Sequence, residues 1–143
     1  MQERNLNTVY WPLRLCYGVV PIAAGLDKFT NILVDWKTYL PGFVERLSPL
    51  DAGVLMRGVG IIEIVAGILV LGVLPRLGSA VVGVWLVLVG VMAAVSGHAD
   101  VMVRDVVMAV GAYVLCVAAM WRGEGWFSGA GVLTGARAHA VGR

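Results

Sequence analysis

The sequence predicts an all-α integral membrane protein, a bundle of four helices that each cross the bilayer. Of the 143 residues, 59% are hydrophobic and only 14% are charged, and the mean hydropathy is +0.86. A soluble fold of this size has too little interior to bury so much apolar surface. Four separate windows are long enough, at about 20 residues each, to span the hydrocarbon core. We therefore expect a single transmembrane domain over residues 1–143.

The first predicted helix covers residues 11–29 and contains both a charge and a proline. Arg14 lies near one end of this window, and Pro21 interrupts it. The small residues after Pro21 resemble the cleavage region of a signal peptide. A signal peptide is disfavoured, because Arg14 lies within the apolar stretch and Pro21 breaks that stretch just before the small residues. A retained helix is the prediction. The loop that follows, residues 30–48, is expected to lie on the outer surface as a partly ordered cap.

The other three predicted helices cover residues 49–74, 77–97 and 101–121. Ser48 is the expected N-cap of the first of these, with Pro49 at the first helical position. The third window has no ionisable side chain, whereas the fourth has Arg104 and Asp105 near its start. Residues 122–143 are rich in glycine and are expected to form a loose tail.

The distribution of basic residues predicts the orientation of the bundle. Basic residues collect in the cytoplasmic loops of membrane proteins. The side of the termini has Arg4, Arg14, Arg76, Arg122, Arg137 and Arg143, whereas the loop and its edges have Lys28, Lys37 and Arg46. We therefore expect both termini in the cytoplasm, and a multi-pass protein of the inner (cytoplasmic) membrane.

Small residues recur at intervals of seven, which places them on one face of each helix. The series are Gly18 and Gly25; Gly53, Gly60 and Gly67; Gly83, Gly90 and Gly97; and Gly111 with Ala118. In lipid, a seam of small residues lets helix backbones approach closely. The pattern predicts a tightly packed bundle.

Ionisable side chains within the spans are the candidate functional residues. A charge at the centre of a membrane helix costs roughly 2.5–3.5 kcal/mol, so such residues face the bundle interior, form pairs and mark function. Glu63 lies three residues after Gly60 and four before Gly67, which places it on the small-residue seam. Arg57 and Arg104 lie on the seams of their own helices, and they are the expected partners of Glu63.

The ionisable residues are predicted to converge in the outer half of the bundle. The candidate ligand-binding residues are Lys28, Arg57, Glu63, His98, Arg104 and Asp105, with Asp27 and Asp100 beside them. One interpretation is a polar cavity that binds a small anion or a quinone head group, or that passes protons through Glu63. The other is a salt-bridge network that sets the helix register, with Asp100 and Arg104 as an i,i+4 pair.

Residue spacing argues against several kinds of site. His98 lies at an outer turn and His139 in the tail, so they do not face each other across the bundle as haem ligands would. His98 and Asp100 supply at most two metal ligands, and no metal site is predicted. Cys16 and Cys116 form no C-x-x-C pair and are expected to be small buried packing residues. A net charge of +2 with no cluster of basic residues gives no indication of a nucleic-acid-binding surface.

Three helices carry motifs that resemble those of a known family. The first has Arg14-Leu15 and Gly18, then Gly25 and Lys28-Phe29; the second has Gly60, Glu63, Gly67, Leu69, Gly72 and Pro75-Arg76; the fourth has Arg104-Asp105 and Gly111. Their order resembles the DoxX-like family of small four-helix membrane proteins, over about residues 13–118. The resemblance implies a membrane redox role, since family members include a quinone-reducing thiosulfate oxidoreductase and accessory proteins of oxidative-stress or respiratory systems. A related branch uses redox-active cysteine pairs, which this sequence lacks.

The resemblance leaves three functional hypotheses. The first is a non-catalytic accessory or assembly subunit, docked to a larger membrane redox or respiratory complex. The second is a quinone-binding subunit of a thiosulfate:quinone-type oxidoreductase involved in electron transport, in which Glu63 transfers the quinol proton and Arg57 and Arg104 hold an anionic substrate. The third is a small-solute transporter, although the sequence shows no inverted repeat. No covalently bound or metal-ligated cofactor is expected, and quinone is the candidate cofactor of the second hypothesis. Membrane lipid is an expected partner in each case.

Overall fold

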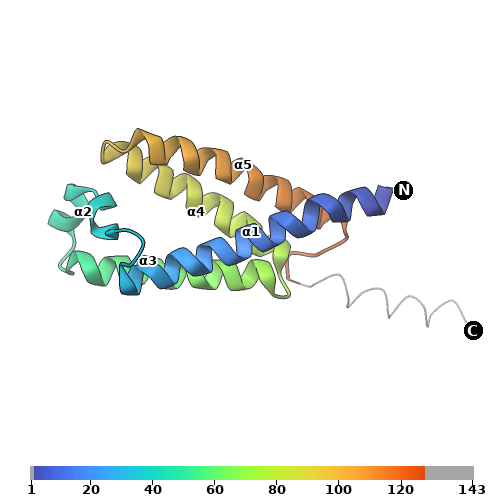
Figure 1. Ribbon diagram of the computed structural model, residues 1–143, viewed down its shortest axis with the longest axis horizontal. Coiled ribbons are helices and arrows are strands. Elements are labelled where there is room, and N and C mark those ends of the chain that lie inside the picture. The colour runs from blue at the N-terminus through green and yellow to red at the C-terminus, as the bar shows by residue number, and fades with distance from the viewer. Residues whose placement is uncertain (1, 128–143) are drawn as a thin grey trace, which may run out of the picture.

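The computed structural model describes residues 2–127, with side chains from Asn5 onward, and these residues form an antiparallel bundle of long helices (Figure 1). The long helices are α1 (Gln2–Thr30), α3 (Ala52–Leu71), α4 (Pro75–Val95) and α5 (Ala99–Trp121). All four are long and apolar enough to cross a membrane. The predicted fold class, an all-α four-helix membrane bundle, is confirmed.

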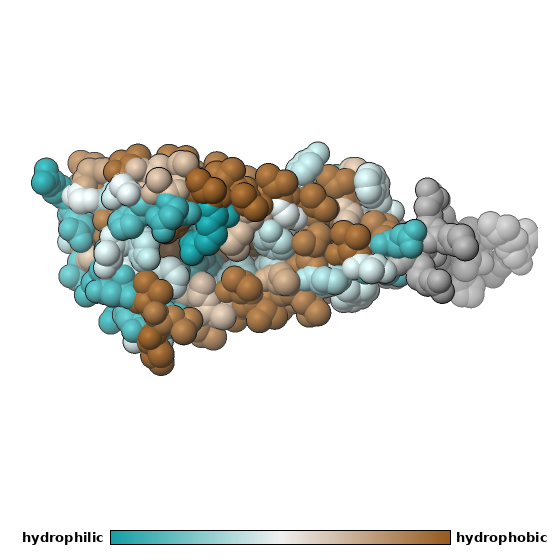
Figure 2. All heavy atoms as spheres, turned by 45° about the horizontal axis from the view of Figure 1, so that its top comes forward, coloured by the Kyte–Doolittle hydropathy of each residue, from teal (hydrophilic) through white to brown (hydrophobic). Residues whose placement is uncertain are grey.

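Large apolar side chains cover the outside of the long helices. Examples from three of them are Ile68, Val84 and Val107, whose exposed fractions are 55%, 64% and 66%. Figure 2 shows hydrophobic surface along the length of the bundle and hydrophilic surface concentrated at one end. A surface of this kind is stable in contact with lipid chains and unstable in contact with water. The chain is a multi-pass membrane protein.

The helices pack chiefly as two antiparallel pairs, α1 with α3 and α4 with α5. Gly25 lies opposite Gly60 and Gly18 opposite Gly67, and a Cβ added at Gly60 would lie 2.6 Å from the Gly25 carbonyl oxygen. Only glycine therefore permits this separation of α1 and α3. The seam on α4 is looser, because a Cβ added at Gly90 would meet its nearest atom, Asp105 Cβ, at 3.5 Å.

The observed ends of α1 and α3 differ from the expected bounds 11–29 and 49–74. α1 begins at Gln2, because its helical backbone continues beyond the apolar window into polar sequence. α3 begins at Ala52, after an N-cap at Asp51 whose carboxylate accepts a hydrogen bond from the Gly53 backbone N–H at 2.8 Å. Ser48, the expected N-cap, instead ends the short helix that precedes this turn.

α4 begins and ends two residues before the expected bounds 77–97, and α5 begins two residues before the expected 101–121 but ends at Trp121 as predicted. Proline at the first turn of a helix loses no backbone hydrogen bond, and α4 accordingly begins at Pro75. At its other end Gly97 has a φ of +83°, a left-handed conformation that favours glycine and turns the chain toward α5. Because this turn is short, α5 begins at Ala99.

Two short elements, η1 (Trp36–Tyr39) and α2 (Gly42–Leu47), connect α1 to α3. They lie at the end of the bundle where α1 ends and α3 and α5 begin (Figure 1). We call this the loop end, and the opposite end, where α1 begins and α5 ends, the terminal end. The segment 30–48, expected to be a partly ordered cap, thus contains one 3₁₀ helix and one short α-helix.

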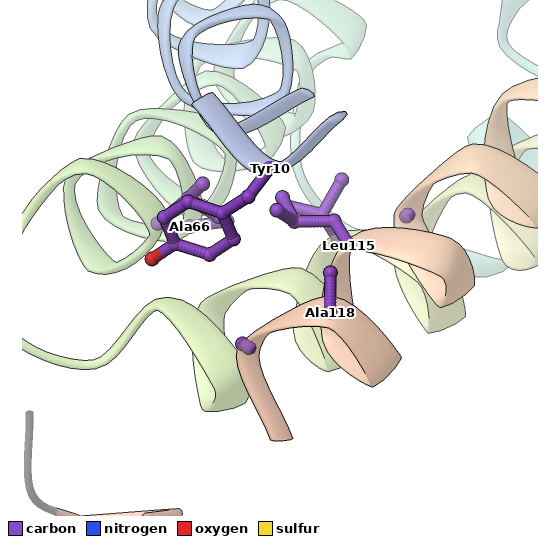
Figure 3. Close-up of a cluster of buried hydrophobic side chains, with 8 residues drawn as sticks. Tyr10, Ala66, Leu115 and Ala118 are labelled. Atoms are coloured by element: carbon purple, nitrogen blue, oxygen red, sulfur yellow. The ribbon is translucent and has the colours of Figure 1, made fainter. Parts of the chain in front are cut away.

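The hydrophobic core lies toward the terminal end. The Tyr10 ring points from α1 into the space between Ala66 of α3 and Leu115 and Ala118 of α5 (Figure 3). Its hydroxyl donates a hydrogen bond to Glu124 Oε1 at 2.8 Å. Glu124, which falls in the expected loose tail, is therefore held against the core by this bond, whereas Phe127 is 83% exposed. His139 and the rest of the expected tail, residues 128–143, lie outside the described residues.

Candidate functional site

Polar side chains from all four long helices meet in the half of the bundle nearer the loop end. Lys28 of α1 forms a salt bridge with Glu63 of α3, with Nζ 2.6 Å from Oε2. The Glu63 carboxylate also faces the indole N–H of Trp85 on α4 and the carboxylate of Asp105 on α5. We call these four residues the four-helix polar cluster. They include three of the candidate residues, Lys28, Glu63 and Asp105.

The direction in which helical side chains lean explains why Lys28 is the partner of Glu63. Along a helix, side chains tilt toward its N-terminus. α1 and α3 are antiparallel, so the Lys28 side chain leans toward the terminal end and the Glu63 side chain toward the loop end. Lys28 lies on the loop-end side of the contact between Gly25 and Gly60, and Glu63 lies on its terminal-end side. Because the side chains lean toward each other, they meet.

The expected partners of Glu63, Arg57 and Arg104, do not pair with it. Both arginines lie nearer the loop end than Glu63, on helices whose side chains lean toward the loop end and so away from Glu63. Arg104 Nε instead lies 2.9 Å from Asp105 Oδ1, and the Arg104 side chain is 60% exposed. The expected i,i+4 pair of Arg104 with Asp100 is therefore wrong, because the buried Asp105 carboxylate binds the guanidinium.

Trp36 of η1 covers the Lys28–Glu63 pair. The Lys28 ammonium lies 3.6 Å from the centre of the Trp36 ring, a cation–π contact. The indole N–H donates a hydrogen bond to Asp27 Oδ2 at 2.7 Å. Asp27 Oδ1 also accepts from the backbone N–H groups of Ile32 and Leu33, each at 3.0 Å. Asp27 therefore holds the start of the loop in the conformation that places Trp36 over the cation.

His98 belongs to the same end of the bundle but contacts the loop. Its ring packs against the Tyr39 ring at an inclination of 51°, with the ring centroids 4.9 Å apart, and the Tyr39 centroid lies 6.2 Å from that of Trp36. The His98 Nδ1 atom is buried and has no hydrogen-bond partner among the described residues. Through these rings η1 connects the α1–α3 pair to the turn between α4 and α5.

Trp85 is the member of the cluster that sequence reasoning missed. Its Nε1 atom is buried and lies near the Glu63 carboxylate, but it does not reach hydrogen-bond geometry with any described residue. An indole N–H is a donor only, so a buried one without an acceptor is costly. The predicted window 77–97 has no ionisable residue, and nothing in its sequence distinguishes Trp85 from a packing residue.

An open, almost entirely apolar groove lies beside this tryptophan on α4. Its volume is about 320 Å³, and it is lined by Ala80, Val81, Val84, Trp85 and Leu88. Val84 and Leu88 are on the exposed surface of the helix, where lipid chains lie in a membrane. The groove therefore connects the lipid-facing surface of α4 with the indole ring of the polar cluster.

A second polar network, at the terminal end, was also missed. Arg14 donates hydrogen bonds to the carbonyl oxygens of Val70 (3.0 Å), Leu71 (2.9 Å) and Gly72, which are the last acceptors of α3. It also donates to the Tyr10 hydroxyl at 3.0 Å. The i,i+4 spacing of Tyr10 and Arg14 was a usable signal. The carbonyl partners could not be predicted from the sequence, because they depend on how the end of α3 is placed relative to α1.

The described residues contain no group of three or more histidine, cysteine, aspartate or glutamate side chains able to hold a metal ion. Cys16 and Cys116 are both free. The expectation that both are buried is wrong for Cys16, which is exposed on the outer face of α1, and Cys116 is partly buried. They lie on helices that contact each other, but neither forms a disulfide.

Comparison with known proteins gives one match. The model of the DoxX family matches residues 10–98, which include most of α1, the loop, α3, α4 and His98. No curated protein and no solved structure gives a significant match to the chain. The matched segment covers more than half of the chain and contains Arg14, Lys28 and Glu63. The chain belongs to the DoxX family.

Proposed function

We propose that the protein is a quinone-binding subunit of a membrane redox complex and that the head group binds at the four-helix polar cluster. The observation that carries this proposal is the Trp85 N–H, which is buried and faces the Glu63 carboxylate without completing a hydrogen bond of normal geometry to any described residue. A quinone carbonyl oxygen is an acceptor of the kind that this donor lacks. Binding it would remove the cost of the unsatisfied group.

Glu63 and Lys28 are the residues suited to proton exchange in this site. Reduction of a quinone to a quinol takes two electrons and two protons, and the electrons come from the redox partner subunits. One of the two protons passes to the reduced oxygen through the Lys28–Glu63 pair, in which the Lys28 ammonium donates a proton to the Glu63 carboxylate and the pair is reprotonated from water. The second proton also comes from water. Thiosulfate as the electron donor is part of the same proposal, and it rests on the family resemblance alone.

The apolar groove on α4 supports a ligand with a long apolar tail. Its wall contains the ring of Trp85, so a chain lying in the groove would contact the indole whose buried N–H faces Glu63. Isoprenoid tails are apolar and bury their area against such side chains. The head and the tail of one quinone would therefore have adjacent sites.

The test is to purify the protein from native membranes in mild detergent and to quantify the quinone that co-elutes. We expect quinone with the wild type, a loss of most of it in Trp85→Phe, and slow quinone reduction in Glu63→Gln. Trp121→Phe is the matched control, because Trp121 is 70% exposed and lies away from the cluster. Wild-type quinone content in Trp85→Phe, or native turnover in Glu63→Gln, would contradict the proposal.

A second candidate function is a non-catalytic accessory or assembly subunit of such a complex. It is favoured by the direct Lys28–Glu63 salt bridge, because a carboxylate that is already neutralised and covered needs no ligand. Mass spectrometry of co-eluting proteins tests this alternative. Stoichiometric redox subunits without quinone would support it, and recovery of the protein alone would contradict it.

A further inference from the structure

A polar pocket of about 130 Å³ lies at the loop end, between the end of α1, η1 and the start of α3. Its walls include three basic side chains, Lys28, Lys37 and Arg57, and one acidic side chain, Asp51. Lys28 already forms a salt bridge with Glu63. Lys37 and Arg57 form no ion pair within the described residues. The pocket therefore contains two cations with no anionic partner.

Asp51 does not neutralise these two cations. Its carboxylate accepts the Gly53 backbone N–H at 2.8 Å and so caps the first turn of α3. A carboxylate at this position complements the partial positive charge of the helix N-terminus. Gly53 also lines the pocket, and Lys37 Nζ lies 3.5 Å from the position that a Cβ on Gly53 would take, with Asp51 Oδ2 at 2.9 Å from the same position. Asp51 therefore offsets part of the charge of Lys37, and the Arg57 guanidinium leaves the pocket with a positive formal charge.

We propose that this pocket binds the phosphate group of an anionic lipid, with the Lys37 ammonium and the Arg57 guanidinium as its charged donors. Arginine and lysine are the side chains that bind phosphate most strongly, arginine through paired N–H donors. The pocket lies where α1 ends and α3 begins, at one end of the membrane spans. Lipid phosphates lie at this depth, outside the hydrocarbon core.

Apolar side chains next to the pocket favour a lipid over free phosphate. Ile32 and Leu33 directly follow Asn31 of the pocket wall, and they are 80% and 74% exposed. Asp27 holds the backbone N–H groups of both, so their positions are set by the fold. Figure 2 shows a projecting hydrophobic group within the hydrophilic surface of the loop end. Exposed apolar residues beside a phosphate site bury their area among acyl chains.

The experiment uses the full-length protein in nanodiscs of phosphatidylcholine, with or without phosphatidylglycerol. Retained phosphatidylglycerol is counted by native mass spectrometry for the wild type, Lys37→Gln and Arg57→Gln. We expect each substitution to weaken retention about fivefold, the effect of one basic residue near an anionic surface. Arg46→Gln is the matched control, because Arg46 is an exposed basic residue of the loop end outside the pocket. It should retain as much lipid as the wild type.

Two further measurements make the outcome decisive. Arg57→Lys keeps the charge and should retain more phosphatidylglycerol than Arg57→Gln, which separates loss of binding from loss of folding. Inorganic phosphate is titrated onto protein in phosphatidylcholine alone. Tight binding of inorganic phosphate that is lost in Arg57→Gln, without selection of phosphatidylglycerol, would overturn the lipid assignment. Equal retention in the pocket variants and Arg46→Gln would overturn the site itself.

Discussion

The Lys28 ammonium lies 2.6 Å from the Glu63 carboxylate, although the two residues are 35 positions apart in the sequence. Their side chains are 4% and 12% exposed, so the charges are almost entirely withdrawn from the surface. A single buried charge in a membrane helix is costly, and a pair in direct contact offsets much of that cost. The pair therefore connects α1 to α3 at a depth where either charge alone would destabilise the bundle.

Removal of one partner of this pair should destabilise the protein more than removal of both. Lys28→Met leaves the Glu63 carboxylate buried and uncompensated, and we expect a loss of about 3–5 kcal/mol in the free energy of unfolding. The double variant Lys28→Met/Glu63→Gln should recover a large part of this loss. The measurement is a double-mutant cycle of denaturant unfolding in detergent. Additive effects of the two single substitutions would contradict a direct interaction.

Arg14 should stabilise the junction between α3 and α4, although it belongs to α1. Arg14→Gln removes the charged donors from the last carbonyl groups of α3, at Val70, Leu71 and Gly72. We expect a loss of about 1.5–3 kcal/mol, the usual contribution of a hydrogen bond to a charged group. Thermal unfolding compares this variant with Arg46→Gln, an exposed substitution that should change stability little. Similar unfolding curves for the two variants would argue against the capping role.

The two glycines Gly60 and Gly58 of α3 should respond oppositely to alanine. A Cβ at Gly60 would lie 2.6 Å from the Gly25 carbonyl oxygen, so the two helices must separate, and we expect a loss of about 1–3 kcal/mol. A Cβ at Gly58 meets no atom within 4 Å. Gly58→Ala should therefore stabilise the helix by up to about 1 kcal/mol. The free energy of unfolding of the two variants in one detergent checks this difference.

Trp85→Phe should leave the ligand-free protein as stable as the wild type or make it more stable. The substitution removes a buried N–H that has no acceptor among the described residues, and such a group costs about 1–3 kcal/mol. The measurement is thermal unfolding of protein from which lipid-soluble ligands have been extracted. A large loss of stability in this variant would mean that Glu63 already accepts the indole N–H in solution.

The predicted orientation, with both termini in the cytoplasm, can be tested by cysteine labelling. Cys16 and Cys116 are first replaced by alanine, and single cysteines are then introduced at Glu45 of the loop end and Asn5 of the terminal end, both exposed. A maleimide that does not cross membranes should label only the position at Glu45 in cells whose inner membrane is intact. Labelling of the position at Asn5 alone would reverse the orientation.

Hydropathy and residue spacing were enough to predict the four spans and the small-residue seams. Both signals are local, because a span needs only a run of apolar residues and a seam only a repeat of two helical turns. The same reasoning placed Glu63 on the interior face of α3, four residues before Gly67. The family was also predictable, since Arg14, Lys28 and Glu63 lie at motif positions within the matched segment.

The sequence by itself thus determined which residues lie in the membrane and which face of each helix is internal. Only the tertiary structure decided the pairing of the polar groups. The close contact between Gly25 and Gly60 sets the position of α1 along α3. This position brings the Lys28 ammonium within contact distance of the Glu63 carboxylate. The cover by Trp36 and the position of Trp85 depend on the loop and on α4, whose placement results from packing between helices. Spacing along one helix contains no information about the register of another, and for this reason the predicted partner Arg104 of α5 was wrong. Arg57 lies on α3 itself, and it was wrong because its side chain leans toward the loop end, away from Glu63.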